Sequence, residues 1–129
     1  MPLDLDAESA KRLAGQKAYL DGQTAEDIVS RHYMSRGYAL VETRWRGRAG
    51  EIDLIFRQGA EYVFVEVKKA RSLDIAATRL SERQLWRIAR SAEDYLANTL
   101  NKPFSVMRLD LAMVDGTGRV DVLENLTLA

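Results

Sequence analysis

The chain has 129 residues, 47% of them hydrophobic, which is enough to bury one core and too little for two domains of ordinary size. The absence of cysteine excludes disulfides, thiolate catalysis and a cysteine zinc site, and the single histidine has no second histidine with which to bind a metal. No apolar run approaches the roughly 20 residues of a membrane span, and Met1 to Asp6 lacks the pattern of an export signal, so we expect a cytoplasmic protein without a membrane partner.

The formal net charge is zero, but positive charge is concentrated in the middle of the chain. Residues 31–90 hold 13 Lys and Arg against 7 Asp and Glu, whereas residues 1–30 and 91–129 each hold 3 basic and 6 acidic residues. A partner with a phosphate backbone requires such a distribution, although a solvated surface can produce it too.

The N-terminal region is predicted to be helical in two parts. Residues 1–20 form a polar lead-in helix, and residues 21–129 form a single domain with no linker, repeat or low-complexity tract. Within that domain, Thr24 is suited to cap a helix over residues 25–35, with Asp27 at the capping-box position.

The next element is a strand over residues 38–46. Arg44, Arg46 and the following Arg48 alternate onto one face beside the strands that come next. These arginines are candidates to grip a nucleic-acid backbone, or they only protect an edge strand from pairing with other chains.

A β-hairpin is predicted over residues 51–56 and 63–68, which both alternate with period two and are rich in β-forming residues. The Gly-Ala pair at residues 59–60 suits a two-residue type II′ turn. That turn sets Asp53 directly opposite Glu66 on one face of the hairpin.

The same register sets Glu51 opposite Lys68 on the carboxylate face and places Ile52 with Leu54 on the other face. An ordinary Glu51–Lys68 cross-strand pair on a solvated strand face is one interpretation of this pattern.

The facing carboxylates favour a second interpretation, which is a metal site. Two carboxylates about 5 Å apart at an effective dielectric of about 20 repel each other by roughly 3 kcal/mol, which a structural hairpin has no reason to carry. A divalent cation reverses the sign of this interaction, and Mg²⁺ is typically held by one or two carboxylates plus substrate phosphate oxygens. Lys68 shares the face of Glu66 and could hold or help deprotonate an attacking water.

A further helix is predicted over residues 82–98, with Ser81 as its N-cap. The apolar face of this helix consists of Leu85, Ile88, Ala89, Ala92, Tyr95 and Leu96. The opposite face carries an arginine stripe, with Trp86 beside it, made of Arg83, Arg87 and Arg90. An exposed Trp among arginines suits stacking on an unpaired base and suits a protein interface equally well.

Two strands are predicted over residues 105–114 and 119–126, joined by a turn at 115–118, and Arg108 is expected to pair with Asp110 on one face. The order of elements predicts an α/β fold, in which helices pack against a mixed β-sheet.

The motifs described above resemble known families. An acidic residue, a turn and Glu-x-Lys on the next strand resemble the PD-(D/E)xK nuclease signature, and the strings GEIDLI at 50–55 and VFVEVK at 63–68 are similar to the YraN family, small bacterial proteins like archaeal Holliday-junction resolvases. The similarity also includes Gly22, Ala25-Glu26, Arg36-Gly37-Tyr38, Arg83-Gln84, Ile88-Ala89-Arg90 and Arg108-Leu109-Asp110. Departures are Leu109, where the family usually has Phe, and the spacing of the basic residues after Lys68.

This resemblance implies a restriction-endonuclease-like core of order αβββαβ and a metal-dependent endonuclease acting on nucleic acid. DNA, branched or single-stranded, is the expected substrate in preference to RNA, and a homodimer is a state that resolvase relatives adopt. The implied metal is Mg²⁺ or Mn²⁺, held by Asp53 and Glu66 with help from the Val67 carbonyl. Lys68 is the implied water-positioning residue.

The resemblance also implies site roles for two residues that have a structural alternative. Glu26 would be a peripheral acidic residue that leans over the sheet, or it is a first-turn residue that favours the helix dipole. Gln84 would orient substrate or water, or it completes a capping box with Ser81.

Two other functions retain the same fold. A non-catalytic nucleic-acid-binding module would depend on the arginine stripe and be indifferent to Lys68. A protein-interaction scaffold would dock through Trp86 and bind no nucleic acid.

Overall fold

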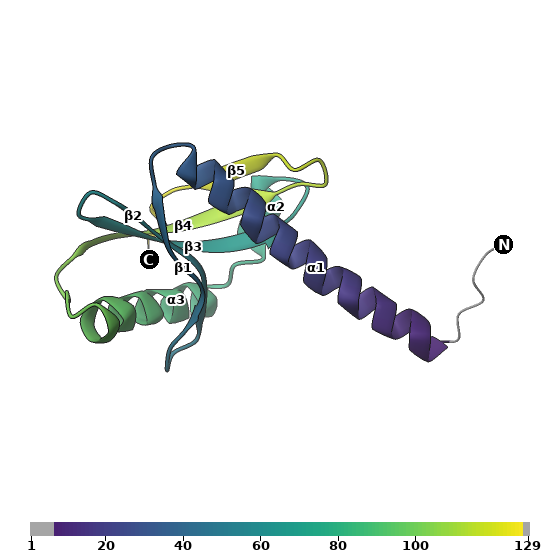
Figure 1. The fold of residues 1–129 in the computed structure, drawn as a ribbon, viewed down its shortest axis with the longest axis horizontal. Helices are drawn as coiled ribbons and strands as arrows, with labels where there is room; N and C mark the ends of the chain where they lie inside the picture. The colour runs from purple at the N-terminus through teal and green to yellow at the C-terminus, as the bar shows by residue number, and fades with distance from the viewer. Residues whose placement is uncertain (1–6, 128–129) are drawn as a thin grey trace.

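The computed structural model describes residues 7–127, with the side chains of residues 10–23 outside the description. The described chain forms one five-stranded mixed sheet in the order β1-β2-β3-β4-β5 (Figure 1). The strands are β1 (Ala39–Arg46), β2 (Glu51–Gln58), β3 (Glu61–Lys69), β4 (Val106–Val114) and β5 (Val120–Leu123). Strands β3 and β4 are parallel, and the other neighbours are antiparallel. The predicted α/β class is confirmed, and the sheet is consistent with a restriction-endonuclease-like core.

Helix α1 (Ala7–Met34) is one continuous helix, and its C-terminal part packs on the sheet. The predicted division into a lead-in helix and a helix over residues 25–35 is therefore wrong, and Thr24 lies inside the helix instead of capping it. A helix that is already formed extends through isolated glycines at about 1 kcal/mol each, whereas starting a second helix requires a new nucleus.

The remaining helices follow β3. Helix α2 (Leu73–Thr78), which the sequence did not predict, packs Ala76 against β4. Helix α3 (Glu82–Asp94) continues into a π-helical turn, η1 (Tyr95–Thr99). Its predicted N-cap, Ser81, is confirmed.

Helices α1 and α3 lie on opposite faces of the sheet (Figure 1). The α1-side core consists of Ala25, Val29, Tyr33, Leu54, Phe56, Val63, Val65, Ala112 and Val114. The α3-side core consists of Ile52, Ile55, Tyr62, Phe64, Ile88, Ala89, Ala92, Tyr95, Leu96 and Leu109. The predicted apolar face of α3 is therefore confirmed, apart from Leu85, which is only partly buried.

The predicted register of the β2–β3 hairpin is confirmed. Leu54 pairs with Val65 and Gln58 pairs with Glu61, across a turn in which Gly59 has a φ of 60°. The prediction that Ile52 shares a face with Leu54 is wrong, because Ile52 packs in the α3-side core.

The alternation of faces breaks at Asp53 and at its neighbour in β1. Thr43 pairs with Leu54 and Trp45 pairs with Ile52, which leaves Arg44 opposite Asp53. Arg44 has a φ of 49°, in the left-handed region that few residues other than glycine adopt. The alternation of faces is therefore interrupted in both β1 and β2 at the same position, beside the candidate metal ligand Asp53.

A buried polar network ties α1 to β4. Asp110, which is 1% exposed, accepts hydrogen bonds from the Tyr33 hydroxyl at 2.7 Å and from Nε and Nη2 of Arg108 at 2.9 Å each. The Asn125 N–H donates to the same carboxylate at 3.0 Å. The predicted Arg108–Asp110 pair is thus confirmed, and its bonds are structural.

Candidate active site

The two carboxylates predicted to face each other lie where the β2–β3 ladder ends. The last paired residues are Leu54 and Val65, so Asp53 and Glu66 come next at the point where backbone pairing stops. The Val67 N–H donates to Oδ2 of Asp53 at 2.8 Å. The β3 backbone itself therefore positions the Asp53 carboxylate.

The electrostatics of this pair disfavour two full negative charges. Burial, which is the largest cause, and the neighbouring Glu66 carboxylate together raise the pKa of Asp53 from 3.8 to about 7, against the opposing Val67 hydrogen bond. The Glu66 side chain is only 18% exposed. Because water screens neither group fully, a nearby cation would be favoured strongly.

Lys68 supplies one such cation. Its Nζ lies 3.3 Å from Oε1 of Glu66, and its side chain is 23% exposed. The alternative Glu51–Lys68 pair does not form, because Glu51 instead lies beside Arg46, whose Nη2 is 4.0 Å from the Glu51 carboxylate. The structure thus brings Asp53, Glu66 and Lys68 together.

Glu26 approaches the pair from α1. Burial raises the pKa of Glu26, Arg44 opposes that shift, and the charges of Asp53 and Glu51 add to it. Nε of Arg44 donates to Oε2 of Glu26 at 2.9 Å, so the Glu26 carboxylate forms an ion pair with Arg44. Glu26 lies far inside α1, so the alternative of a first-turn residue that favours the helix dipole does not hold.

A small hollow of about 190 Å³ lies on the α1 side of this ion pair. Its lining is mostly polar and consists of Glu26, Asp27, Ser30, Thr43, Arg44 and Leu54. The reversal at Arg44 directs its guanidinium to this side of the sheet, away from the side on which Trp45 packs.

Gln84 makes both bonds of a capping box. Its N–H donates to Oγ of Ser81 at 3.1 Å, and its Oε1 accepts the Ser81 N–H at 3.2 Å. The structural interpretation of Gln84 is therefore observed, and a role at the site stays a prediction.

The arginines predicted to bind nucleic acid fall into two groups. Arg44 is committed to Glu26, whereas Arg46 has a side chain 80% exposed and Arg48 lies exposed beyond the end of β1. The three arginines do not share one face of the sheet, because the left-handed backbone at Arg44 interrupts the alternation of side chains.

The arginine stripe and Trp86 are all exposed along α3, and Trp86 is 46% exposed. Arg87 lies over the loop that precedes β2, where a Cβ on Gly50 would meet Cδ of Arg87 at 2.9 Å. Gly50 has a φ of 148°, a conformation that favours glycine, and a Cβ there would also displace the Arg87 side chain. The stripe is thereby held close to the start of the strand that carries Asp53.

The donor set fits a hard divalent cation with few protein ligands. Among the side chains that the structure describes, no three or more His, Cys, Asp or Glu residues form a group that could hold a metal ion. Asp53 and Glu66, with the Val67 carbonyl, would leave the remaining coordination to water or phosphate oxygens, as is usual for Mg²⁺. Nothing in the sequence pattern signalled the Val67 N–H as the donor that fixes Asp53, because it belongs to the backbone.

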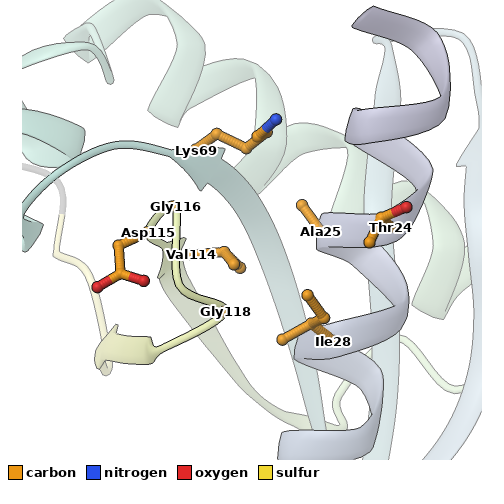
Figure 2. Close-up of a pocket in the computed structure, with 8 residues that line it drawn as sticks. All are labelled: Thr24, Ala25, Ile28, Lys69, Val114, Asp115, Gly116 and Gly118. Atoms are coloured by element: carbon orange, nitrogen blue, oxygen red, sulfur yellow. The ribbon is translucent and has the colours of Figure 1, made fainter. Parts of the chain in front are cut away.

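A second hollow, of about 270 Å³, lies between α1 and the β4–β5 turn (Figure 2). The side chain of Lys69 extends toward α1 there, whereas Asp115 accepts hydrogen bonds from the Thr117 N–H and hydroxyl and from the Arg119 N–H. These bonds lower the pKa of Asp115 and commit its carboxylate to the turn. This hollow is lined by neither Asp53 nor Glu66.

Known proteins are similar to this chain over most of its length. In the part of the chain that the structure describes, no helix combines the length and apolar character needed to cross a membrane. A family model described as "Uncharacterised protein family UPF0102" matches residues 25–123.

Three relatives illustrate the similarity. A UPF0102 protein of Ruegeria pomeroyi is 50% identical over 111 residues, covering 86% of this chain and 90% of the relative. One from Cereibacter sphaeroides strain ATCC 17029 is 47% identical over 113 residues, covering 88% of this chain and 97% of the relative. One from Roseobacter denitrificans is 44% identical over 117 residues, covering 91% of each chain. The chain belongs to the UPF0102 family.

Proposed function

We propose that this protein is a metal-dependent nuclease that hydrolyses phosphodiester bonds in nucleic acid, with DNA as its substrate. The observation that carries this proposal is the juxtaposition of Asp53 and Glu66 at the end of the β2–β3 ladder. Burial and mutual repulsion raise the pKa of Asp53 to about 7, which is a cost without benefit in a purely structural hairpin.

The resemblance to the PD-(D/E)xK nucleases and to the YraN family supports the same conclusion. It rests on the strings at 50–55 and 63–68, which are the segments that carry Asp53, Glu66 and Lys68. The mixed sheet flanked by helices is the architecture that this resemblance implies.

The chemistry would be divided among three side chains. Asp53 and Glu66, with the Val67 carbonyl, would hold Mg²⁺ or Mn²⁺, which neutralises charge on the scissile phosphate and polarises a water molecule. Lys68, whose ammonium group lies 3.3 Å from Glu66, would orient the attacking water and offset charge developing on the phosphate.

Substrate binding is assigned to the exposed cations near the carboxylates. Arg87 of the arginine stripe lies over the loop before β2, so a phosphate that it bound would lie near the start of the strand that carries Asp53. Trp86 is exposed and would stack on an unpaired base, which favours branched or single-stranded DNA over a regular duplex.

The test compares the wild type with Lys68→Met and with Lys69→Met, a neighbouring lysine that lies outside the carboxylate cluster. Labelled branched, single-stranded and duplex DNA and RNA are incubated in Mn²⁺, and bound and cut species are scored together. Cutting by the wild type and Lys69→Met, lost in Lys68→Met, is the expected result. Cutting that survives in Lys68→Met, or no cutting of any substrate, would overturn the proposed nuclease.

A second candidate function is a non-catalytic nucleic-acid-binding module, and one observation favours it. Two of the three acidic groups at the site already have a protein cation, since Glu66 lies beside Lys68 and Glu26 is bound by Arg44. A module of this kind would bind DNA in a salt-sensitive manner, would not cut it, and would be insensitive to Lys68→Met.

A further inference from the structure

The most exposed large apolar side chain among the described residues lies away from the carboxylates, in the loop between η1 and β4. Phe104 is 98% exposed, and Val106 beside it is 61% exposed. Phe104 borders a hollow of about 470 Å³, lined by Arg57, Gly59, Ala60, Tyr62, Lys102, Phe104, Ser105 and Val106. We call this hollow the Phe104 pocket.

Two exposed cations, Arg57 and Lys102, line the same hollow. Among the residues that the structure describes, neither Arg57 nor Lys102 forms an ion pair. Glu61, which follows the hairpin turn, lies 3.5 Å from Nη1 of Arg108 and is directed to that guanidinium. The Phe104 pocket therefore combines an aromatic face with positive charge that no described side chain compensates.

The loop holds Phe104 in a defined position. The Lys102 N–H donates to the Leu96 carbonyl at 2.7 Å, and the Lys102 carbonyl accepts the Ser105 N–H at 3.2 Å and the Ser105 hydroxyl at 2.9 Å. Pro103 further restricts the backbone between them. A loop backbone that is ordered before binding loses little conformational entropy on binding.

The Phe104 pocket lies on the α3 side of the sheet, the side to which alternation along β3 also assigns Glu66. Arg57 pairs with Tyr62, and Tyr62 packs in the α3-side core together with Phe64, which precedes Glu66 by two residues. Arg57 lies four positions after Asp53 on β2, a distance of about 13 Å at the usual rise of about 3.3 Å per residue. One strand of nucleic acid can therefore reach from the candidate active site to Phe104.

We propose that the Phe104 pocket is a second binding site for an unpaired nucleotide of the substrate strand, beyond the nucleotide that is cut. Its base stacks on Phe104, and its phosphates contact Lys102 and Arg57. This inference rests on the proposed function, because it takes nucleic acid as the substrate. An acidic, apolar protein segment would fit less well, since it would leave the planar ring without a stacking partner.

The test measures the affinity of oligothymidylates of about 5 and about 20 nucleotides, bracketing the usual site sizes for single strands. All variants carry Lys68→Met, and no divalent metal is added, so binding is measured without cutting. Phe104→Ala is expected to weaken binding of the longer strand by about 5- to 100-fold, and to reduce the gain in affinity with length. Leu123→Ala, which removes another exposed apolar side chain, is the matched control and should bind like the parent.

The charges are tested by salt dependence. Lys102→Ala should reduce the slope of log affinity against log salt by about 0.7, the share of one phosphate contact on a single strand, whereas Arg31→Ala on α1 should leave it unchanged. Because Phe104 and Lys102 are exposed, neither substitution threatens the fold.

The outcomes separate this site from the proposed function. If the wild type cuts DNA but Phe104→Ala binds the longer strand as tightly as Leu123→Ala, only the Phe104 pocket is overturned. If the parent binds no nucleic acid, both proposals fail. If Phe104→Ala instead converts a dimer to a monomer in sedimentation and leaves binding unchanged, the surface joins two copies of the chain and the nucleotide site is wrong.

Discussion

The N–H of Val67 donates to the Asp53 carboxylate across 2.8 Å at the position where β2 and β3 stop pairing. A side-chain oxygen thus takes the place that a backbone carbonyl would have in a continued ladder. This bond fixes a partly buried carboxylate beside Glu66, and it makes the ionisation of Asp53 a measurable property of the folded protein.

Asp53→Asn is expected to stabilise the metal-free protein at pH 8 and to leave it nearly unchanged at pH 4. The folded pKa of Asp53, about 7, lies above the usual 3.8, so the folded state binds a proton that the unfolded state releases between these values. Wild-type stability therefore falls as pH rises through this window, by on the order of 3 kcal/mol. Asparagine keeps the acceptor for Val67 but carries no charge.

Urea unfolding in EDTA at both pH values measures this effect. Glu51→Gln, on an exposed strand residue beside Asp53, is the control and should give a small difference at either pH. An equal gain for Asp53→Asn at pH 4 and pH 8 would show that the charge of Asp53 is not the cause.

Mg²⁺ or Mn²⁺ is expected to stabilise the wild type at neutral pH by about 2.7 kcal/mol when the metal concentration is about 100 times Kd. Asp53→Asn and Glu66→Gln should each abolish this gain, because each removes one of the two proposed carboxylate ligands. Thermal unfolding with and without EDTA measures it. Glu61→Gln, on the same strand but directed to Arg108, should respond like the wild type; a full response of Asp53→Asn would contradict the assigned ligands.

The sequence predicts the part of this site where the backbone geometry is regular. The hairpin register follows from the turn at residues 59–60 and from period-two alternation, so the placement of Asp53 opposite Glu66 could be predicted. The face of Ile52 could not, because the alternation breaks beside a left-handed Arg44, and no glycine marks that position.

Helix boundaries show the same limit. Ser81 and Gln84 form a capping box that the sequence contains, although the same glutamine also matches the family pattern of a site residue. Thr24 also has the residue type of a cap, but it lies within α1. Because the helix continues through this position, no new helix start is present for Thr24 to cap. Local motifs predict an end only when the preceding segment is not itself helical.

Arg44→Gly is expected to be more stable than Arg44→Ala by about 1 kcal/mol. Both variants lose the 2.9 Å pair with Glu26, but only alanine retains the cost of the left-handed φ of 49°. Urea unfolding of the two variants gives the difference directly, with Arg46→Gly and Arg46→Ala as a control pair in ordinary strand geometry. In the control pair the alanine variant should be more stable than the glycine variant. If alanine is also the more stable of the two at position 44, strain at Arg44 is contradicted.

Arg83→Ala is expected to reduce the salt dependence of single-stranded DNA binding by about 0.7 in log–log slope, with little effect on stability. Arg87→Ala should reduce the slope similarly and should also cost stability, because the Arg87 side chain packs on Gly50. Arg87→Lys separates the two effects, since it keeps the charge and most of the aliphatic contact. Binding titrations at several salt concentrations, together with urea unfolding, measure both quantities; an unchanged slope in Arg83→Ala would show that the arginine stripe does not contact phosphate.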